Sequence, residues 1–458
     1  MCKNKISMLI SAMALTIAVS SCNIYKKYEL PQNGIVGEYT QAAAQPADSS
    51  ALGNLPWDKI FTDPILQGYI RLALENNLDL QNAKLNVDIA QAQLLGAKLS
   101  YLPSLAFAPN GSGSSLGGSK LSWGYQLPLS LSWEVDIFGR LTNSKRKAKA
   151  QLLQSEAYRQ AVNSQIIGGV ANTYYALVAL NKQLAIYKET AEAWKQSVQV
   201  MKDMKEAGRF TEVSVVQSTA NYHSVLAAIP NIEMSIHELN NTMSLLLNTP
   251  RSTWIVDCES MITLPAEISE EIPMSYLAQR PDVKAAEQAF AMAYYATNVA
   301  RSNFYPSITL SATGGYGTLV GSAIIDPAQW LVNLAGQLTM PLFSRGKNIA
   351  NMKAAKAQQQ QSLNNFQTTL LSAGNEVSNA LITITKTKEA GVNIEFQEEN
   401  LKKAVEYNKD LLTLGTTTYL EVLTAQQQLL QSQIQVVNNK LSTNQAAINL
   451  YQALGGGR

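Results

Sequence analysis

The chain repeats one structural plan, and this internal duplication restricts its fold more than any other feature of the sequence. The segment Asn77–Leu80 returns as Arg280–Val283, and Tyr101–Ser104 returns as Phe304–Ser307, both 203 positions later. Self-similarity at a fixed spacing is typical of repeated structural units. We therefore predict an internal two-fold structural repeat. Each copy contains a helix, a pair of strands, a very long helix, a tight turn and another long helix.

The duplication predicts the following division of the chain. The first repeat is residues 63–250, with strands at about 103–110 and 121–137 and long helices at about 140–205 and 212–248. A linker at 251–272 follows. The second repeat is residues 273–458, with strands at about 306–317 and 329–342 and long helices at about 345–412 and 419–453.

The strands show the clearest periodicity in the sequence. From Trp123 to Val135 every odd-numbered residue is apolar or aromatic, and the even-numbered ones are Gly, Gln, Pro, Ser and Glu. Such alternation indicates a two-faced strand, and its length and flanking aromatic residues match a transmembrane strand. Soluble hairpins that cover a core are the alternative. Pro128 fits least well, because proline cannot donate a hydrogen bond to a neighbouring strand.

The helical segments are unusually long. Neither 140–205 nor 345–412 contains a strong helix breaker. At 1.5 Å per residue each helix extends roughly 100 Å, too far for a compact globule without breaks. In the last helix, from Leu420 to Tyr451, residues that include Gln427 recur every three or four positions and predict a coiled-coil seam.

The N-terminus has the layout of a secretory leader with a lipobox. Two lysines precede an apolar run at 6–19 that is too short to span a bilayer, and Cys22 follows it. We expect a signal peptide at 1–21 and a lipidated segment at 22–62 that begins with Cys22; an ordinary leader with a chance cysteine is the alternative. The leader holds two of the 36 basic residues and none of the 34 acidic ones, so 34 of each remain. No charge excess therefore favours nucleic acid.

Four transmembrane strands cannot close a barrel. An open sheet edge in lipid leaves backbone groups unpaired at a cost of several kcal/mol each. Three copies would supply twelve strands, enough to enclose water. The predicted fold class is therefore a mixed α and β membrane protein, a homotrimer with a 12-stranded β-barrel that continues into a long α-helical barrel.

Several short segments, in this order and partly duplicated, carry a resemblance to a known family. They are the lipobox at Cys22, Trp57–Leu66, Asn77–Ala83, Gln279–Val283, Tyr305–Ser307 and Gly415–Gln426. Asp63 and Pro64 supply a helix N-cap and a first-turn proline, and Pro281 opens the matching helix. The mature chain resembles the TolC/OprM-type (NodT-like) outer-membrane factors of resistance-nodulation-division efflux systems.

The resemblance implies an outer-membrane lipoprotein that extends into the periplasm as a passive exit duct for drugs, other small molecules or metal ions. The implied partners are two further copies of the chain, a periplasmic adaptor (membrane fusion) protein, an inner-membrane RND-type transporter and outer-membrane lipid. Neither a cofactor nor nucleic acid is implied. The transported substrate and the identity of the partners cannot be inferred from the sequence.

The same resemblance places adaptor docking and the gate at the two turns between long helices. The first turn would contribute Gly208, Arg209, Phe210 and Thr211, and the second Gly415, Thr416, Thr417 and Thr418. Members of the family often carry an acidic residue near the second turn. This chain has threonines there, and its nearest upstream acid is Asp410. A plain interhelical turn is the alternative interpretation.

The sequence offers no pattern typical of catalysis or metal binding. His223 and His237 lie fourteen positions apart in a helix that contains Pro230, which does not make a metal site. The basic cluster at 145–149 favours a solvated helix face or lipid-headgroup contact over nucleic acid. We predict that the chain is not an enzyme. A duct for type I protein secretion and a structural lipoprotein that conducts nothing remain the other two functional classes.

Overall fold

The computed structural model describes residues 25–32, 34–43, 55–115, 117, 121–250, 253–259, 274–318 and 330–457 of the 458-residue chain. The leader and Cys22 lie outside the described residues. The chain divides into two compact units. The sheet unit comprises residues 1–31, 85–156 and 284–368, and the helical unit comprises residues 32–84, 157–283 and 369–458.

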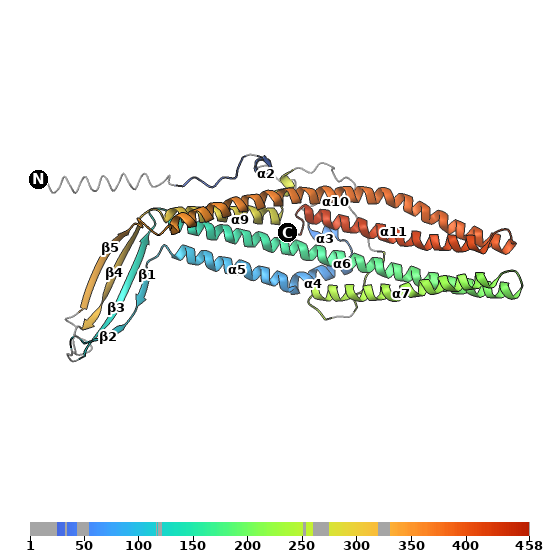
Figure 1. The fold of residues 1–458 in the computed structure, drawn as a ribbon, viewed down its shortest axis with the longest axis horizontal. Helices are drawn as coiled ribbons and strands as arrows, with labels where there is room; N and C mark the ends of the chain where they lie inside the picture. The colour runs from blue at the N-terminus through green and yellow to red at the C-terminus, as the bar shows by residue number, and fades with distance from the viewer. Residues whose placement is uncertain are drawn as a thin grey trace. The chain divides into compact units, whose positions relative to one another are not determined.

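Helices form most of the described chain (Figure 1). The shorter ones are α2 (Gly34–Ala43), α3 (Trp57–Ile60), α4 (Pro64–Asn76), α5 (Leu78–Leu99), α8 (Met274–Leu277) and α9 (Pro281–Ser302). The longer ones are α6 (Arg140–Glu206), α7 (Glu212–Leu246), α10 (Lys347–Leu414) and α11 (Tyr419–Ala453). α6 has 67 residues and α10 has 68. Within the described ranges, none of these helices combines the length and apolarity that a membrane crossing requires.

The N-cap of α4 links separate segments of the helical unit. Asp63 accepts a 2.8 Å hydrogen bond from the backbone N–H of Ile65, and Pro64 is the first helical residue, as the sequence predicts. The Tyr174 hydroxyl of α6 donates to the same carboxylate and accepts from the backbone N–H of Asp257 at 2.9 Å. Burial raises the pKa of Tyr174, and the bond to Asp63 raises it further. The Asp63 carboxylate therefore both caps α4 and links it to α6.

The sheet unit contains one antiparallel sheet in the order β1-β3-β4-β5, with β2 also paired to β3. The strands are β1 (Ser104–Phe107), β2 (Asn110–Ser114), β3 (Ser122–Val135), β4 (Ser307–Thr318) and β5 (Trp330–Thr339). β1 and β2 follow one another along the same edge of β3, and β5 forms the opposite edge. A single copy of the described sheet therefore ends in two open edges.

The strand registers bring the apolar residues onto one face. Leu131 of β3 lies opposite Leu105 of β1 on one side and Ala312 of β4 on the other, and Ala312 in turn lies opposite Leu334 of β5. Direct partners in an antiparallel pair share a face. This face is exposed in the single chain, with Leu105 65% and Leu334 76% accessible. The opposite face carries mainly Ser, Thr, Gly, Asn and Gln.

The structure has two short strands where the sequence predicts one strand at about 103–110. β1 ends at Phe107 and β2 begins at Asn110, so residues 111–114, which lie outside the predicted strands, are paired to β3. The interruption contains Pro109, which has no N–H to donate to β3. Ala108 keeps one bond, from its N–H to the carbonyl of Pro128 at 3.3 Å. β1 and β2 therefore lie end to end along this edge of β3.

Pro128 is accommodated inside β3 by a glycine on the neighbouring strand. Its direct partner on β4 is Gly315. A Cβ atom at Gly315 would lie 2.3 Å from the Leu127 carbonyl oxygen and 2.8 Å from the Pro128 Cα. Only glycine permits so close an approach of two backbones. The residue that fits the predicted strand least well is thus compensated by a residue from the second half of the chain.

Candidate functional site

The first predicted turn joins α6 to α7 by a tight reversal. Gly208 has a φ of 72°, in the left-handed region. Its N–H bonds to the Lys205 carbonyl at 2.9 Å, and the Arg209 N–H bonds to the Met204 carbonyl at 2.9 Å. These two bonds form a Schellman motif, which satisfies the last carbonyl groups of a helix. Thr211 is the N-cap residue of α7, without a side-chain capping bond.

The second predicted turn joins α10 to α11 in the same way. Gly415 has a φ of 74°. Its N–H bonds to the Leu412 carbonyl at 3.1 Å, and the Thr416 N–H bonds to the Leu411 carbonyl at 3.0 Å. Thr418 is the N-cap residue of α11, also without a side-chain capping bond. Both turns thus have one design, in which a left-handed glycine ends the helix.

The two turns meet in a small apolar cluster of the helical unit. Met201, Val215, Tyr419 and Leu423 are buried together, and Phe210 packs against them. The rings of Phe210 and Tyr419 lie edge to face with centroids 6.5 Å apart. Burial raises the pKa of Tyr419, and a hydrogen bond with Ser218 partly offsets the shift. Of the predicted tip residues, Phe210 therefore takes part in this cluster, whereas its buried partners were not among the predicted site residues.

The charges at the tips are distributed unevenly. Lys205 forms an ion pair with Glu212 across the first turn. Arg209 is exposed and has no ion pair within the described part of the chain. In the second turn, the Thr417 hydroxyl bonds to the carboxylate of Glu421. The acid expected from the sequence, Asp410, is also exposed, whereas Glu421 in the first turn of α11 was not expected.

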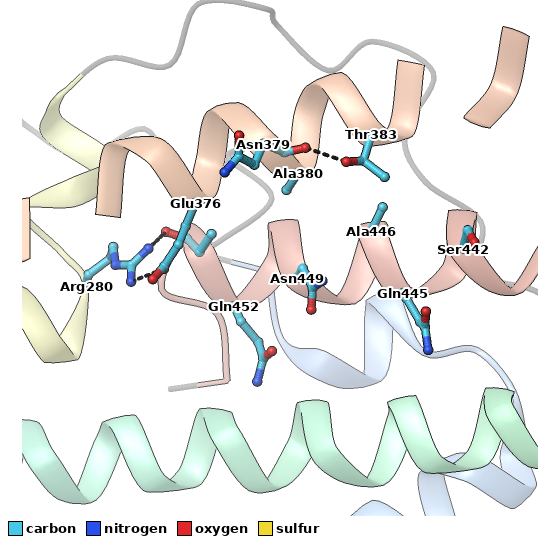
Figure 2. Close-up of a pocket in the computed structure, with 11 residues that line it drawn as sticks. Arg280, Glu376, Asn379, Ala380, Thr383, Ser442, Gln445, Ala446, Asn449 and Gln452 are labelled. Atoms are coloured by element: carbon cyan, nitrogen blue, oxygen red, sulfur yellow. Dashed lines mark hydrogen bonds and ion pairs between the residues drawn. The ribbon is translucent and has the colours of Figure 1, made fainter. Parts of the chain in front are cut away.

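A polar cleft of about 570 Å³ lies between α10 and α11 (Figure 2). At one end, the buried guanidinium of Arg280 bonds to both oxygens of Asp282 at 3.0 and 2.6 Å and to Glu376 at 2.7 Å. It also donates to the Ala453 carbonyl at 2.9 Å. Burial disfavours the charged form of Arg280 and by itself would lower its pKa. The hydrogen bonds and negative charges of its acidic partners outweigh this effect and raise the pKa. Arg280 therefore fastens the start of α9 to α10 and α11.

The cleft has the composition of a structural recess. Amide and hydroxyl side chains line it, among them Asn379, Thr383 and Asn449. Within the described residues, no group of three or more His, Cys, Asp or Glu side chains is placed to hold a metal ion. His223 and His237 are both exposed. The predicted site residues therefore lie at the hairpin tips and not in this cleft.

Comparisons with known proteins agree with this arrangement. The profile described as outer membrane efflux protein matches residues 69–249 and 272–456. SilC of Salmonella typhimurium, a probable outer membrane lipoprotein, is 28% identical over 459 residues, with 98% of each chain covered. The toluene efflux pump outer membrane protein TtgC of Pseudomonas putida is 26% identical over 481 residues, with 100% of this chain and 96% of TtgC covered.

A solved structure extends the similarity to the fold. The structure of CusC is 27% identical to this chain, with a TM-score of 0.82 and coverage of 95% of this chain and 100% of CusC. In Escherichia coli O157:H7, CusC is named a cation efflux system protein. Since the family profile covers most of the sequence in two successive segments, the chain belongs to the outer membrane efflux protein family.

Proposed function

We propose that three copies of this chain close a twelve-stranded β-barrel in the outer membrane and form the passive exit duct of a tripartite efflux system. The observation that carries the proposal is the sheet with two open edges and one exposed apolar face. In lipid, unpaired backbone groups at such edges are costly. Pairing the β1–β2 edge of one copy with the β5 edge of the next removes them. Three identical head-to-tail contacts then close a ring.

The opposite face of the sheet suits a water-filled interior. It carries Ser, Thr, Gly, Asn and Gln residues of β3, β4 and β5. We propose that α6, α7, α10 and α11 continue the barrel as an α-helical duct in the periplasm. The paired turns at Gly208 and Gly415, together with the two family segments, support a duplicated ancestry for the two halves.

The duct is tested by conductance. Purified protein in a planar bilayer is expected to give discrete channel openings, and native mass measurement in detergent is expected to show three copies of the chain. A stable monomer, or a trimer that never conducts, would contradict the proposal. The second outcome would favour a purely structural lipoprotein. An adjacent gene for a secretion-type transporter, in place of an efflux transporter and adaptor, would favour a protein-secretion duct.

We further propose that Cys22 carries the lipid anchor. The support is the lipobox and the similarity to SilC, a probable lipoprotein. Metabolic labelling with a fatty acid should mark the chain, and Cys22→Ser should abolish the label. Persistent labelling of the Cys22→Ser chain would place the acyl group elsewhere.

The tips are proposed as the gate and the docking site of the periplasmic adaptor. Supporting this, Arg209 is exposed next to Phe210, whose partly buried ring packs against the buried Tyr419. An inner-membrane transporter of the RND type would complete the assembly. The cargo is a small molecule or metal ion: the similar proteins CusC and TtgC are named for cations and for toluene, respectively.

A further inference from the structure

The helical residues nearest the sheet carry an unusual concentration of positive charge. The first ten residues of α6 (140–149) and of α10 (347–356) contain no Asp or Glu. The last ten residues of α5 (90–99) and of α9 (293–302) contain none either. Lysine or arginine is present in all four segments. These are the ends at which helices join strands.

Eight cations around the starts of α6 and α10 form a group that we name the basic collar. Its members are Lys145, Arg146, Lys147 and Lys149 on α6, and Arg345, Lys347, Lys353 and Lys356 at the start of α10. All eight are exposed, and none has an ion pair in the described part of the chain. In the helical unit, by contrast, several lysines are paired with acids, as in Lys188–Glu233 and Lys402–Glu398.

Helix stability does not explain the collar. The N-terminus of a helix carries partial positive charge, so cations near it are unfavourable. α6 and α10 nevertheless have no acid in their first turns. The backbone N–H groups of Leu141 and Thr142 are already bonded to Asp136, at 2.8 and 2.7 Å. At α6, an external anion would therefore be held by the collar side chains and not by the helix terminus.

The surface beside the collar indicates the kind of anion. Leu342 and Phe343, between β5 and Arg345, are 89% and 86% exposed. The sheet carries its exposed apolar face up to this point. A boundary between apolar and cationic side chains matches the boundary between acyl chains and phosphate headgroups. A free phosphate ion would account for the cations but not for Leu342 and Phe343.

We propose that the basic collar binds the headgroups of anionic phospholipids in the periplasmic leaflet of the outer membrane. This inference rests on the proposed barrel, because it requires the sheet to lie in lipid. The collar would select anionic over zwitterionic phospholipid and set the depth at which the sheet ends and the helices begin.

The test measures lipid selectivity of the reconstituted trimer. Spin-labelled phosphatidylglycerol and spin-labelled phosphatidylcholine are compared in phosphatidylcholine vesicles by the fraction immobilised at the protein. Since each basic residue near a membrane surface contributes attraction to anionic lipid, the native protein should prefer phosphatidylglycerol by roughly three-fold or more at low salt. High salt should reduce this preference, because exposed charges are screened.

Two collar variants and a matched control locate the effect. One variant changes Lys145, Arg146, Lys147 and Lys149 to Gln, and the other changes Arg345, Lys347, Lys353 and Lys356 to Gln. The control changes Lys84, Lys202, Lys388 and Lys409 to Gln, which are exposed lysines of the helical unit. Each collar variant should lose most of the preference for phosphatidylglycerol, and the control should keep it. Lysine-to-arginine versions of the collar should also keep it.

Several outcomes would overturn the inference. A native trimer that conducts but shows no preference for phosphatidylglycerol refutes the collar and leaves the duct intact. A preference that survives in both glutamine variants, or at high salt if those variants do not fold, also refutes it. If inorganic phosphate specifically displaced the spin-labelled phosphatidylglycerol at constant ionic strength, the collar would be a free-phosphate site. If the glutamine variants lost binding to purified peptidoglycan but kept the lipid selectivity of the native protein, the collar would be a cell-wall contact instead.

Discussion

Arg280 shows how one side chain joins distant parts of the helical unit. Its guanidinium contacts Asp282, Glu376 and the carbonyl of Ala453. We expect Arg280→Ala to lower stability by about 2–3 kcal/mol, because hydrogen bonds to charged groups are lost and the Ala453 carbonyl loses its donor. Arg280→Lys should cause a smaller loss of stability than Arg280→Ala, since its ammonium keeps the charge but cannot reproduce the bidentate geometry.

The measurement is the midpoint of thermal unfolding of the detergent-solubilised protein. Lys403→Ala is the control, because Lys403 pairs with Glu399 on an exposed helix face and such pairs contribute little. Equal midpoints for Arg280→Ala and Lys403→Ala would show that the buried guanidinium is not a structural anchor.

Gly315 is the second residue with a specific structural requirement. Because a Cβ there would approach the Leu127 carbonyl oxygen to 2.3 Å, Gly315→Ala should displace β4 from β3 and reduce the yield of folded trimer. Gly336→Ala in β5 is the matched control, since its nearest contact would be Leu310 Cδ2 at 3.5 Å, an ordinary distance. Gel mobility with and without heating measures the folded fraction. Equal yields from the two variants would contradict the close contact.

Local signals such as a helix cap are predictable from the sequence, but contacts between residues far apart in the chain are not. Asp63 and Pro64 mark a helix start because the capping groups lie within a few residues of one another. The compensation of Pro128 by Gly315 depends on strand register, which no local pattern determines. The contacts of Arg280 likewise depend on tertiary packing. The motif at 280–282 is therefore recognisable in the sequence, but its structural role is not.

At the scale of elements, the predicted seam of α11 is only partly correct. Leu420 is 61% exposed and Gln427 is exposed, although both were placed on the seam. Tyr419, Val422 and Gln426 are buried instead. The reason is that α11 contacts residues of α6, α7 and α10 in the tip cluster, so its buried face is not the narrow stripe of a two-stranded coiled coil.

The helix-ending turns give a prediction at the same scale. Apart from its two chain neighbours, no described residue has an atom within 4 Å of a Cβ built at Gly415, so a substitution there is opposed by backbone conformation. Gly415→Val should cost about 1–2 kcal/mol, and Gly415→Asn less, because asparagine tolerates the left-handed region. Hydrogen exchange of the peptide over 411–418 should accelerate in the Val variant.

The first turn serves as an internal control for that measurement. Its Schellman bonds at Gly208 and Arg209 are independent of Gly415, so exchange over 204–211 should remain unchanged. Equal acceleration in both peptides would mean that the substitution acts through the shared cluster of Phe210 and Tyr419 and not through the turn itself.

At the scale of the whole molecule, the gate prediction concerns Arg209. Closing six hairpin tips around one aperture requires close packing of the turns, and an exposed guanidinium there can form charge-assisted bonds with a neighbouring copy or with the adaptor. If Arg209 holds the closed aperture, Arg209→Ala should raise single-channel conductance and admit a large antibiotic such as vancomycin. If it holds the adaptor instead, conductance should stay unchanged while efflux falls.

Lys202→Ala separates a specific role from a general loss of charge. Lys202 is an exposed cation near the end of the same helix and has no ion pair in the described part of the chain. It should alter neither conductance nor efflux. If Arg209→Ala behaves like Lys202→Ala in conductance, antibiotic entry and efflux, then Arg209 is a solvated turn residue. The gate assignment would in that case have no support, and the packing of Phe210 against Tyr419 would serve only to hold the two turns together in the single chain.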